Sequence, residues 1–527
     1  MSDLPIDRRT LVGAGLSLAG SAMIAPALGR TAGDPVAATR HGRVRGRTES
    51  GVHRFLGIRY GADTAPRRFQ PALPPEPWRE VRDALAYGAA APQKKIDEPT
   101  SEDCLFLNVW TPGLDTGKRP VMVYIHGGGH ASGSGASPLY EGTRLCQHGD
   151  VVVVTLNHRL NILGYGYFAR FGGADLADSG NVGNLDLILA LQWVKDNIAG
   201  FGGDPDRVMI FGQSGGGGKV VTLMAMPPAA GLFSRAASMS GQQTTCMGPR
   251  HATMRAKAVL DHFGLPSERM GELRAMPVAK LLEALNLPDP IEPDEKIIFW
   301  SVMDSRSTPR HPFYPGAPMQ SAKIPLICGG VHDETRYFLR GDERNFHLSW
   351  EELPAKLDPE MVADLDPNVV VARYRELYPT YTPSDVFFAA SCAGRSWRGT
   401  VMQAEERAKI GAPTWMYQLD WPSPAQGGRL GAFHTLDIPL VFRTLDAPGS
   451  LTGVAEDARK VSDAMSDAFI SLARSGSPQH AAIPEWPHYT LPSRTTLLFD
   501  RKLEVVDDPR SEERKLFATV PFVKPGT

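Results

Sequence analysis

Short apolar runs recur along the chain and alternate with segments in which apolar residues follow helical spacing. The runs at 120–125, 151–156 and 208–211 are apolar at almost every position, which is typical of strands buried on both faces of a sheet. Between the last two runs, apolar residues stand at 185, 188, 189, 193 and 198, close to helical spacing. This alternation predicts an α/β fold with a central, twisted, mostly parallel sheet and helices on both faces.

Further strands are expected on either side of this region. Residues 42–46, 52–60 and 105–110 indicate short strands in an antiparallel arrangement before the parallel strands begin. The runs at 325–330 and 415–420 predict two more buried strands late in the chain.

The first thirty residues predict targeting rather than fold. Arg8 and Arg9 precede an apolar stretch that runs to about Ala25, and Ala25-Pro26-Ala27 offers a small-residue cleavage site. This pattern predicts a twin-arginine-type export signal over residues 1–30, cleaved near Ala27, and hence a periplasmic or secreted protein. The alternative is a chance arginine pair before an uncleaved anchor, but the stretch is short and rich in small residues, which disfavours a membrane span. A single domain is expected over residues 35–527.

Composition narrows the possible partners. The chain has 527 residues, of which 42% are hydrophobic and 22% charged, and this balance suits a large soluble core. The formal net charge of −2 gives no reason to expect nucleic acid or an anionic membrane as a partner. The five cysteines are scattered without metal-ligand spacing, so we expect neither a disulfide framework nor a metal site.

The turn after residues 208–211 is the first candidate for chemistry. It reads Gly212-Gln213-Ser214-Gly215-Gly216, and a helix is expected from about Lys219 to Met226. Gly-x-Ser-x-Gly between strand and helix is typical of a nucleophile elbow, in which a strained turn projects the serine above the sheet edge. A chain with 53 glycines produces such spacings by chance. Ser214 therefore needs an oxyanion hole, an acid and a histidine elsewhere in the chain to count as a nucleophile.

A glycine run after the strand at 120–125 supplies the candidate oxyanion hole. Residues 126–130 read His-Gly-Gly-Gly-His. Backbone N–H groups of such a run can point at one spot and stabilise the negative oxygen of a tetrahedral intermediate. The alternative is a flexible loop without a role. Its position directly after a buried strand and before the elbow favours the esterase arrangement.

Several longer motifs make the chain resemble the type-B carboxylesterases, the family that includes para-nitrobenzyl-type esterases and cholinesterases. The matching segments cover nearly the whole chain after residue 35. They read FLGIRY, SEDCLFLNVWTP, HGGG, NHRLNILGY, GNVGNLDLILALQWVKDNIAGFGGDPDRVMIFGQSGGG, GGVHDETRYF, GAFHTLDIPLVF and WPHY. The resemblance implies one α/β-hydrolase domain with large insertions, which accounts for the length without extra domains.

The resemblance also implies the remaining site residues. It places the acid at Glu334, after the strand at 325–330, although Asp333 is adjacent and Thr335 stands where the family usually has glycine. It places the histidine at His434.

The oxyanion would be held by backbone N–H groups of Gly128, Gly129 and Gly215. The acid and histidine complete the order serine, acid, histidine that α/β-hydrolases use.

The expected function is that of a serine carboxylesterase with a Ser-Glu-His triad, acting on a small-molecule ester without metal or organic cofactor. Two alternatives stay open: an amide or carbamate hydrolase on the same triad, and a non-catalytic cholinesterase-like binding module. The binding module is disfavoured because all three triad residues are present. We expect no integral membrane association and a monomer or weak homo-oligomer.

Five positions depart from the family pattern or need interpretation. Gln213 stands where the family usually has glutamate, and Lys94 stands where cholinesterases have a choline-binding tryptophan; both argue against a cationic choline ester. Cys104 matches a family half-cystine, but no cysteine precedes it. His130 contacts substrate or, in the interpretation we favour, lies at a polar rim. Ser240 resembles a family serine that hydrogen-bonds near the triad.

Two insertions are expected to wall a gorge above Ser214. One spans 288–319 and carries the aromatic residues Phe299, Trp300, Phe313 and Tyr314, and the other spans 336–397 and is largely helical in pattern. Residue by residue, core packing is the expected role of these aromatics. The glycines at 215–218 indicate either close backbone packing under the elbow or extra room beside the scissile carbonyl, and the sequence leaves both open.

Overall fold

The computed structural model describes residues 33–94 and 96–522. From Pro35 onward these residues belong to one compact unit. The export signal expected at residues 1–30 lies outside the described residues and stays a prediction, as does the single domain expected over 35–527.

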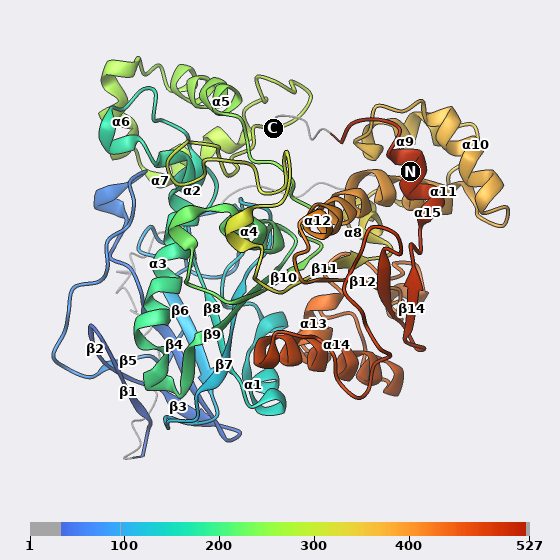
Figure 1. Ribbon diagram of the computed structural model, residues 1–527. Helices are drawn as coiled ribbons and strands as arrows, with labels where there is room; N and C mark the ends of the chain where they lie inside the picture. Colours follow the sequence, from blue (N-terminus) through green and yellow to red (C-terminus); the bar gives the residue numbers. More distant parts are fainter. Residues whose placement is uncertain (1–32, 95, 523–527) are drawn as a thin grey trace, which may run out of the picture. The chain divides into compact units, whose positions relative to one another are not determined.

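The described residues form an eleven-stranded sheet with a mostly parallel centre (Figure 1). The seven strands from β13 to β8 are parallel to their neighbours, and the remaining strands at both edges are antiparallel. In sheet order the strands are β14 (Glu504–Asp507), β13 (Thr495–Phe499), β12 (Thr414–Leu419), β11 (Leu326–Val331), β10 (Arg235–Met239), β9 (Gly203–Gln213), β7 (Arg119–Ile125), β8 (Val152–Leu156), β6 (Phe106–Thr111), β4 (Val52–Arg59) and β3 (Arg47–Glu49).

A second sheet, of three short strands, is formed by residues near the beginning of the described chain. It joins β1 (Val36–Thr39), β2 (Gly42–Arg45) and β5 (Arg82–Asp83) in that order. The strands expected from the apolar runs are all present, and the early ones are antiparallel as expected.

The central strands send alternate side chains to opposite faces of the sheet because a strand has a period of two. Val121 and Val123 of β7 point into one core, and Met122 and Tyr124 point into the other. Three helices cover the first core: α3 (Val182–Asn197), α4 (Gly215–Ala225) and α12 (Arg398–Lys409). Three others cover the second core (Figure 1): α1 (Thr143–Gly149), α13 (Asp437–Phe442) and α14 (Glu456–Ser475).

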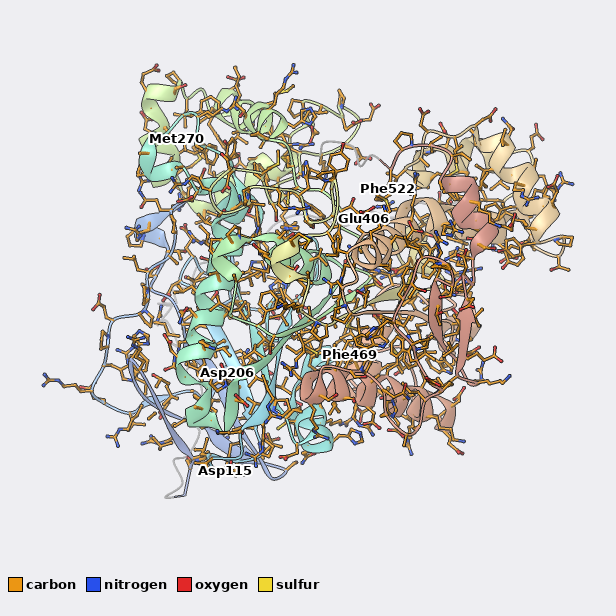
Figure 2. All side chains as sticks on the ribbon, in the orientation of Figure 1. Asp115, Asp206, Met270, Glu406, Phe469 and Phe522 are labelled. Carbon is orange, nitrogen blue, oxygen red and sulfur yellow. The ribbon has the colours of Figure 1, made fainter. Side chains whose placement is uncertain are left out.

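Helix α14, the longest of these helices, packs on the sheet through aromatic contacts. Phe469 of α14 lies at the helix–sheet interface (Figure 2), where its ring meets Phe211 of β9 and Tyr417 of β12 at centroid distances of 6.3 and 6.4 Å. Buried aromatic contacts of this kind remove large apolar areas from water, and that burial is the main stabilising contribution to such a core. The helices on both faces agree with the arrangement predicted from the alternating pattern.

Helices outside the two layers that cover the sheet form two regions with cores of their own. The first contains α2 (Asn161–Tyr165), α5 (Pro249–His262), α6 (Met270–Ala275) and α7 (Val278–Leu281). The second contains α8 (Glu334–Leu339), α9 (Leu353–Met361), α10 (Pro367–Leu377), α11 (Pro383–Cys392) and α15 (Ser511–Phe517). The helical pattern expected over 336–397 is confirmed.

A buried ion pair joins the loop after β8 to α3. The side chains of Arg159 and Asp186 are 3% and 0% exposed and meet at 2.6 Å, with a second bond of 2.8 Å from Arg159 Nε. Such a pair needs both partners, because removal of either leaves an uncompensated buried charge. It fixes the segment NHRLN against the helix that packs on the sheet.

Among the described residues, no helix combines the length and apolarity that crossing a bilayer requires.

Candidate active site

Ser214 occupies a strained turn at the carboxyl end of β9. Its backbone angles are φ 59° and ψ −126°, a region that non-glycine residues rarely adopt and that is found mainly at functional sites. Its N–H donates to the carbonyl of Met239 on the neighbouring strand at 2.8 Å, and its carbonyl accepts from Gly218 N–H at 2.9 Å. Helix α4 therefore starts directly after Ser214, at Gly215, four residues before the start expected from sequence.

The glycines around Ser214 let α4 lie directly against the end of β7. A Cβ on Gly216 would overlap the carbonyl oxygen of Ile125, and one on Gly215 would overlap the carbonyl of Gly129. A Cβ on Gly217 would stand 2.8 Å from the Cα of Gly241. Close backbone packing is thus the reason for these three glycines. Gly218 differs, because a Cβ there would meet the side chain of Gln243 rather than a backbone atom.

His434 and Glu334 meet beside this turn. Both are buried, at 4% and 2% exposed, and His434 Nδ1–H donates a hydrogen bond to Glu334 Oε2. The other carboxylate oxygen accepts from the N–H of Val331 at 3.2 Å and from Gln242 Nε2 at 3.5 Å. The carboxylate is thereby held in one orientation toward the imidazole. A third group, the Gln213 amide nitrogen, lies 3.2 Å from His434 Nε2.

Asp333, the neighbouring acid, has a different position. Its N–H donates to the carbonyl of Ala432 at 2.9 Å, and its Oδ2 accepts from Ala432 N–H at 3.0 Å. Burial favours the neutral form of Asp333, but His332, Arg336 and the Ala432 N–H outweigh it and bring its pKa down to about 2. Asp333 thus ties the loop before His434 to the end of β11, which leaves Glu334 facing the ring.

A second buried carboxyl, which the sequence did not predict as part of the site, belongs to Asp437 on α13. It is 0% exposed, and its Oδ2 accepts from the Tyr417 hydroxyl at 2.8 Å. Burial first, and then the negative charge of Glu334, raise the pKa of Asp437 to about 7. Its place three residues after His434 in the HTLD sequence was the available signal.

The glycine loop after β7 turns back on itself beside Ser214. Gly128 and Gly129 have φ of 81° and 62°, which glycine adopts without strain. Gly128 O accepts from the N–H groups of Ala131 and Ser132 at 3.2 and 3.1 Å. Of the three expected oxyanion donors, Gly129 and Gly215 line the same cavity as Ser214; among the described residues Gly128 is not part of that lining.

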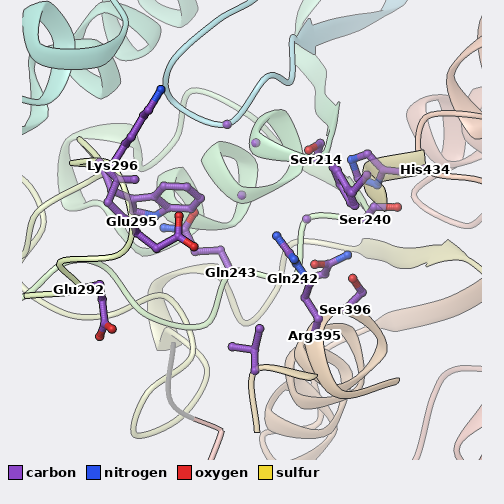
Figure 3. Close-up of a pocket in the computed structure, with 18 of the residues that line it drawn as sticks. Ser214, Ser240, Gln242, Gln243, Glu292, Glu295, Lys296, Arg395, Ser396 and His434 are labelled. Carbon is purple, nitrogen blue, oxygen red and sulfur yellow. The ribbon is translucent and has the colours of Figure 1, made fainter. Parts of the chain in front are cut away.

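The cavity has a volume of about 450 Å³. Figure 3 shows Ser214, Ser240 and His434 grouped at one side, Arg395 and Gln242 next to them, and Glu292, Glu295 and Lys296 on the opposite wall. Both expected insertions contribute to its walls, the first through residues between 289 and 300 and the second through residues between 338 and 396.

Among the four aromatic residues named for the first insertion, only Trp300 lines the cavity. Phe299 and Phe313 are packed in cores, and Tyr314 is 60% exposed. Core packing as the usual role is thus confirmed for two of the four.

Two expectations about single residues were wrong. His130 lies neither at a rim nor on the cavity wall: it is 1% exposed, its Nε2 is 3.0 Å from Ser301 Oγ, and its ring packs on Trp300 and Tyr165. Ser240 lines the cavity, but its buried hydroxyl has no hydrogen-bond partner among the described residues. The pattern GGGH gave no signal that the second histidine would turn inward.

All five cysteines are buried and unpaired. Within residues 33–94 and 96–522, no group of three or more His, Cys, Asp or Glu side chains has the arrangement of a metal site.

Known proteins resemble this chain over most of its length. A sequence profile described as the carboxylesterase family matches residues 33–517. The para-nitrobenzyl esterase of Bacillus subtilis is 35% identical over 501 residues, covering 92% of this chain and 98% of the relative. The phenmedipham hydrolase of Pseudarthrobacter oxydans is 32% identical over 512 residues, covering 90% and 97%.

Solved structures give the same result. A carboxylesterase of Geobacillus stearothermophilus superimposes with a TM-score of 0.81 at 35% identity, covering 92% of this chain and 99% of that one. A structure titled PNB esterase gives 0.78 at 34% identity, covering 91% and 99%. The expected α/β-hydrolase fold is therefore confirmed. The chain belongs to the carboxylesterase family and is a carboxylic ester hydrolase.

Proposed function

We propose that this protein is a serine esterase that hydrolyses small carboxylic esters through an acyl-enzyme on Ser214, with His434 as base and Glu334 as its partner. The observation that carries the proposal is the buried hydrogen bond between Glu334 and His434 Nδ1, together with the cavity that His434 and Ser214 both line. A carboxylate on Nδ1 leaves Nε2 as the basic nitrogen of the ring.

The proposed reaction has two halves. His434 Nε2 takes the proton of Ser214 as Oγ attacks the ester carbonyl, and then gives that proton to the leaving alcohol. Water, activated by the same nitrogen, hydrolyses the acyl-enzyme. Glu334 holds the imidazole in place and stabilises the imidazolium that forms in each half.

The oxyanion of each tetrahedral intermediate would be held by N–H groups of the glycine loop and of the residue after the nucleophile. Gly129 and Gly215 are best supported, because they line the cavity with Ser214. One such donor contributes roughly 3 kcal/mol of transition-state stabilisation. Gly128 would act through the turn that orients Gly129.

The cavity supports a small-molecule ester as substrate. Gln213 is buried against His434 and is 1% exposed, so it supplies no negative charge for a cationic alcohol group. The twin-arginine pattern supports export to the periplasm or beyond. The weaker alternative of an amide or carbamate hydrolase would use the same three residues.

The test is a panel of p-nitrophenyl esters of graded acyl length, with matched anilides, assayed on the wild type and on Ser214→Ala. Ser214→Ala should lower kcat/KM by about 10⁴-fold or more while its circular dichroism and melting temperature stay close to wild type. Substantial residual turnover by the folded variant would rule out Ser214 as nucleophile. Anilide rates comparable to ester rates would favour the amide alternative.

A further inference from the structure

Lys219 is a fully buried lysine directly behind the glycine loop. It lies on α4, five residues after Ser214, and is 0% exposed. Its Nζ donates to the carbonyl of Gly129 at 2.8 Å and to the carbonyl of His126 at 3.3 Å. Burial lowers the pKa of Lys219 to about 7, and no carboxylate among the described residues opposes this shift. Burying a lysine without a counter-charge is costly, so its two carbonyl contacts need an explanation.

The contacts fix the part of the loop that can move most freely. Gly129 has positive φ and no side chain, so the peptide groups on either side of it can swing at little steric cost. The preceding peptide is held through Gly128 O, which accepts from Ala131 and Ser132 N–H. The following peptide is held through Gly129 O, which accepts from Lys219. The contacts of Gly128 O hold the peptide plane that carries Gly129 N–H, and the Lys219 contact restrains Gly129 from its other side.

The glycine run explains how a lysine can reach this place. Gly215 packs against Gly129 and Gly216 against the end of β7, with no room for a Cβ at either position. Helix α4 therefore lies at backbone contact with the loop. Residues four apart share a helix face, so Lys219 follows Gly215 one turn along, on the side that faces the loop.

The side chains around Lys219 are three histidines, and they give no indication of another role for it. His126 of the glycine loop and His158 after β8 stack at 4.9 Å, and both are buried, as is His130 of the glycine loop. Burial, and then the charge of Lys219, lower the pKa of all three histidines. These imidazoles are neutral neighbours rather than counter-ions. Lys219 itself is not part of the cavity lining formed by the described residues, so it has no contact with substrate.

We propose that Lys219 is a positioning residue: it holds the Gly129 carbonyl and the first residue of the loop so that Gly129 N–H points at the oxyanion before substrate binds. The proposal rests on the proposed function, because it presupposes an oxyanion formed at Ser214. A hydrogen-bond donor that already points at the oxyanion stabilises the transition state more than a donor that must first reorient.

The experiment compares Lys219→Met with wild type in the full-length protein. Methionine has a similar length and no donor, so it removes the two hydrogen bonds and keeps most of the volume. Loss of one oriented donor should lower kcat by roughly 10²-fold, while KM stays within about threefold because the ground-state ester gains little from the hole. Lys219→Gln, whose amide can reach one carbonyl, should recover part of the loss.

A transition-state analogue separates positioning from a general structural effect. A trifluoromethyl ketone forms a hemiketal: Ser214 Oγ bonds to its carbonyl carbon, the carbonyl π pair becomes an oxyanion, and the serine proton goes to His434. Its affinity should fall by the same factor as kcat/KM in Lys219→Met. The affinity of a ketone-free amide analogue should not change.

Val221→Ala is the matched control. Val221 is buried on α4 but packs against Phe313 and Ala317 rather than the loop. It should lower the melting temperature and leave kcat per active site unchanged.

Three results bear on the proposal differently. A fall in kcat and in analogue affinity together, in folded Lys219→Met, would support it. A kcat within twofold of wild type, or a fall equal to that of Val221→Ala, would overturn it. If Lys219→Met does not fold, the same criteria apply to Lys219→Gln. Failure of the proposed function has a separate signature, because Ser214→Ala would then retain activity and the ketone would form no adduct.

Discussion

Replacing Asp437 by asparagine should stabilise this protein at neutral and alkaline pH. The carboxyl is fully buried and has one hydrogen bond, from Tyr417 to Oδ2. Its Oδ1 has no hydrogen-bond partner among the described residues, and the charge of Glu334 lies nearby. Asparagine has nearly the same shape, and its carbonyl can accept the Tyr417 hydrogen bond without a charge.

The size of the effect follows from the pKa of Asp437. Burial and Glu334 raise that pKa from 3.8 to about 7. The folded chain then binds a proton that the unfolded chain releases, so the stability associated with Asp437 is present below pH 4 and lost as pH rises to 7. The difference corresponds to roughly 4 kcal/mol above pH 7, which is an upper limit because the fold can relax around the charge.

The assay is the melting temperature of wild type and Asp437→Asn from pH 4.5 to pH 8.5. The variant's advantage should be largest at pH 8.5 and shrink toward pH 4.5. Asp206→Asn is the control: its side chain is 80% exposed, and the substitution should shift the melting temperature little at any pH. An Asp437→Asn protein that melts below wild type at pH 8.5, or a gap independent of pH, would refute the reasoning.

Three further predictions concern the elbow and its supports. Gly216→Ala should lower the free energy of unfolding by about 1–3 kcal/mol and reduce activity, because its Cβ would overlap the carbonyl oxygen of Ile125. Gly271→Ala is the control: a Cβ there meets nothing within 4 Å, so its melting temperature should stay at the wild-type value. Asp186→Ala should lower the free energy of unfolding, measured with urea, by about 3–5 kcal/mol, because it leaves the buried Arg159 charge without a partner. Replacing both residues by apolar ones should restore much of this stability, and failure to do so would contradict the explanation by charge. Gln213→Glu should move the acidic limb of the pH–rate profile to higher pH, because the new carboxylate would favour the protonated form of His434. An unchanged profile together with a stronger preference for cationic esters would instead show that residue 213 faces the substrate.

The sequence by itself determined the reaction class and most of the framework. Apolar runs with a strand period, followed by glycine-rich turns, are local signals, because a buried strand must be apolar and a backbone contact must lack a Cβ. This is why the strand before Glu334 was predicted within one residue of its observed bounds. The run at 208–211 marks only the buried part of β9, which spans Gly203–Gln213 and begins with polar residues. The start of α4 was misjudged, since four glycines in a row weaken the helical signal although the fold requires them there.

Only the tertiary structure decided which groups meet. Asp333 and Glu334 are equivalent as adjacent acids in the chain, and a pairing between segments 100 residues apart turns one toward the His434 loop and the other toward its ring. The tertiary structure likewise places Gln213 against the imidazole, His130 in the interior and Lys219 behind the glycine loop. Each role depends on which strand ends lie side by side and on what the surrounding side chains bury, and neither is encoded in the local pattern of residues.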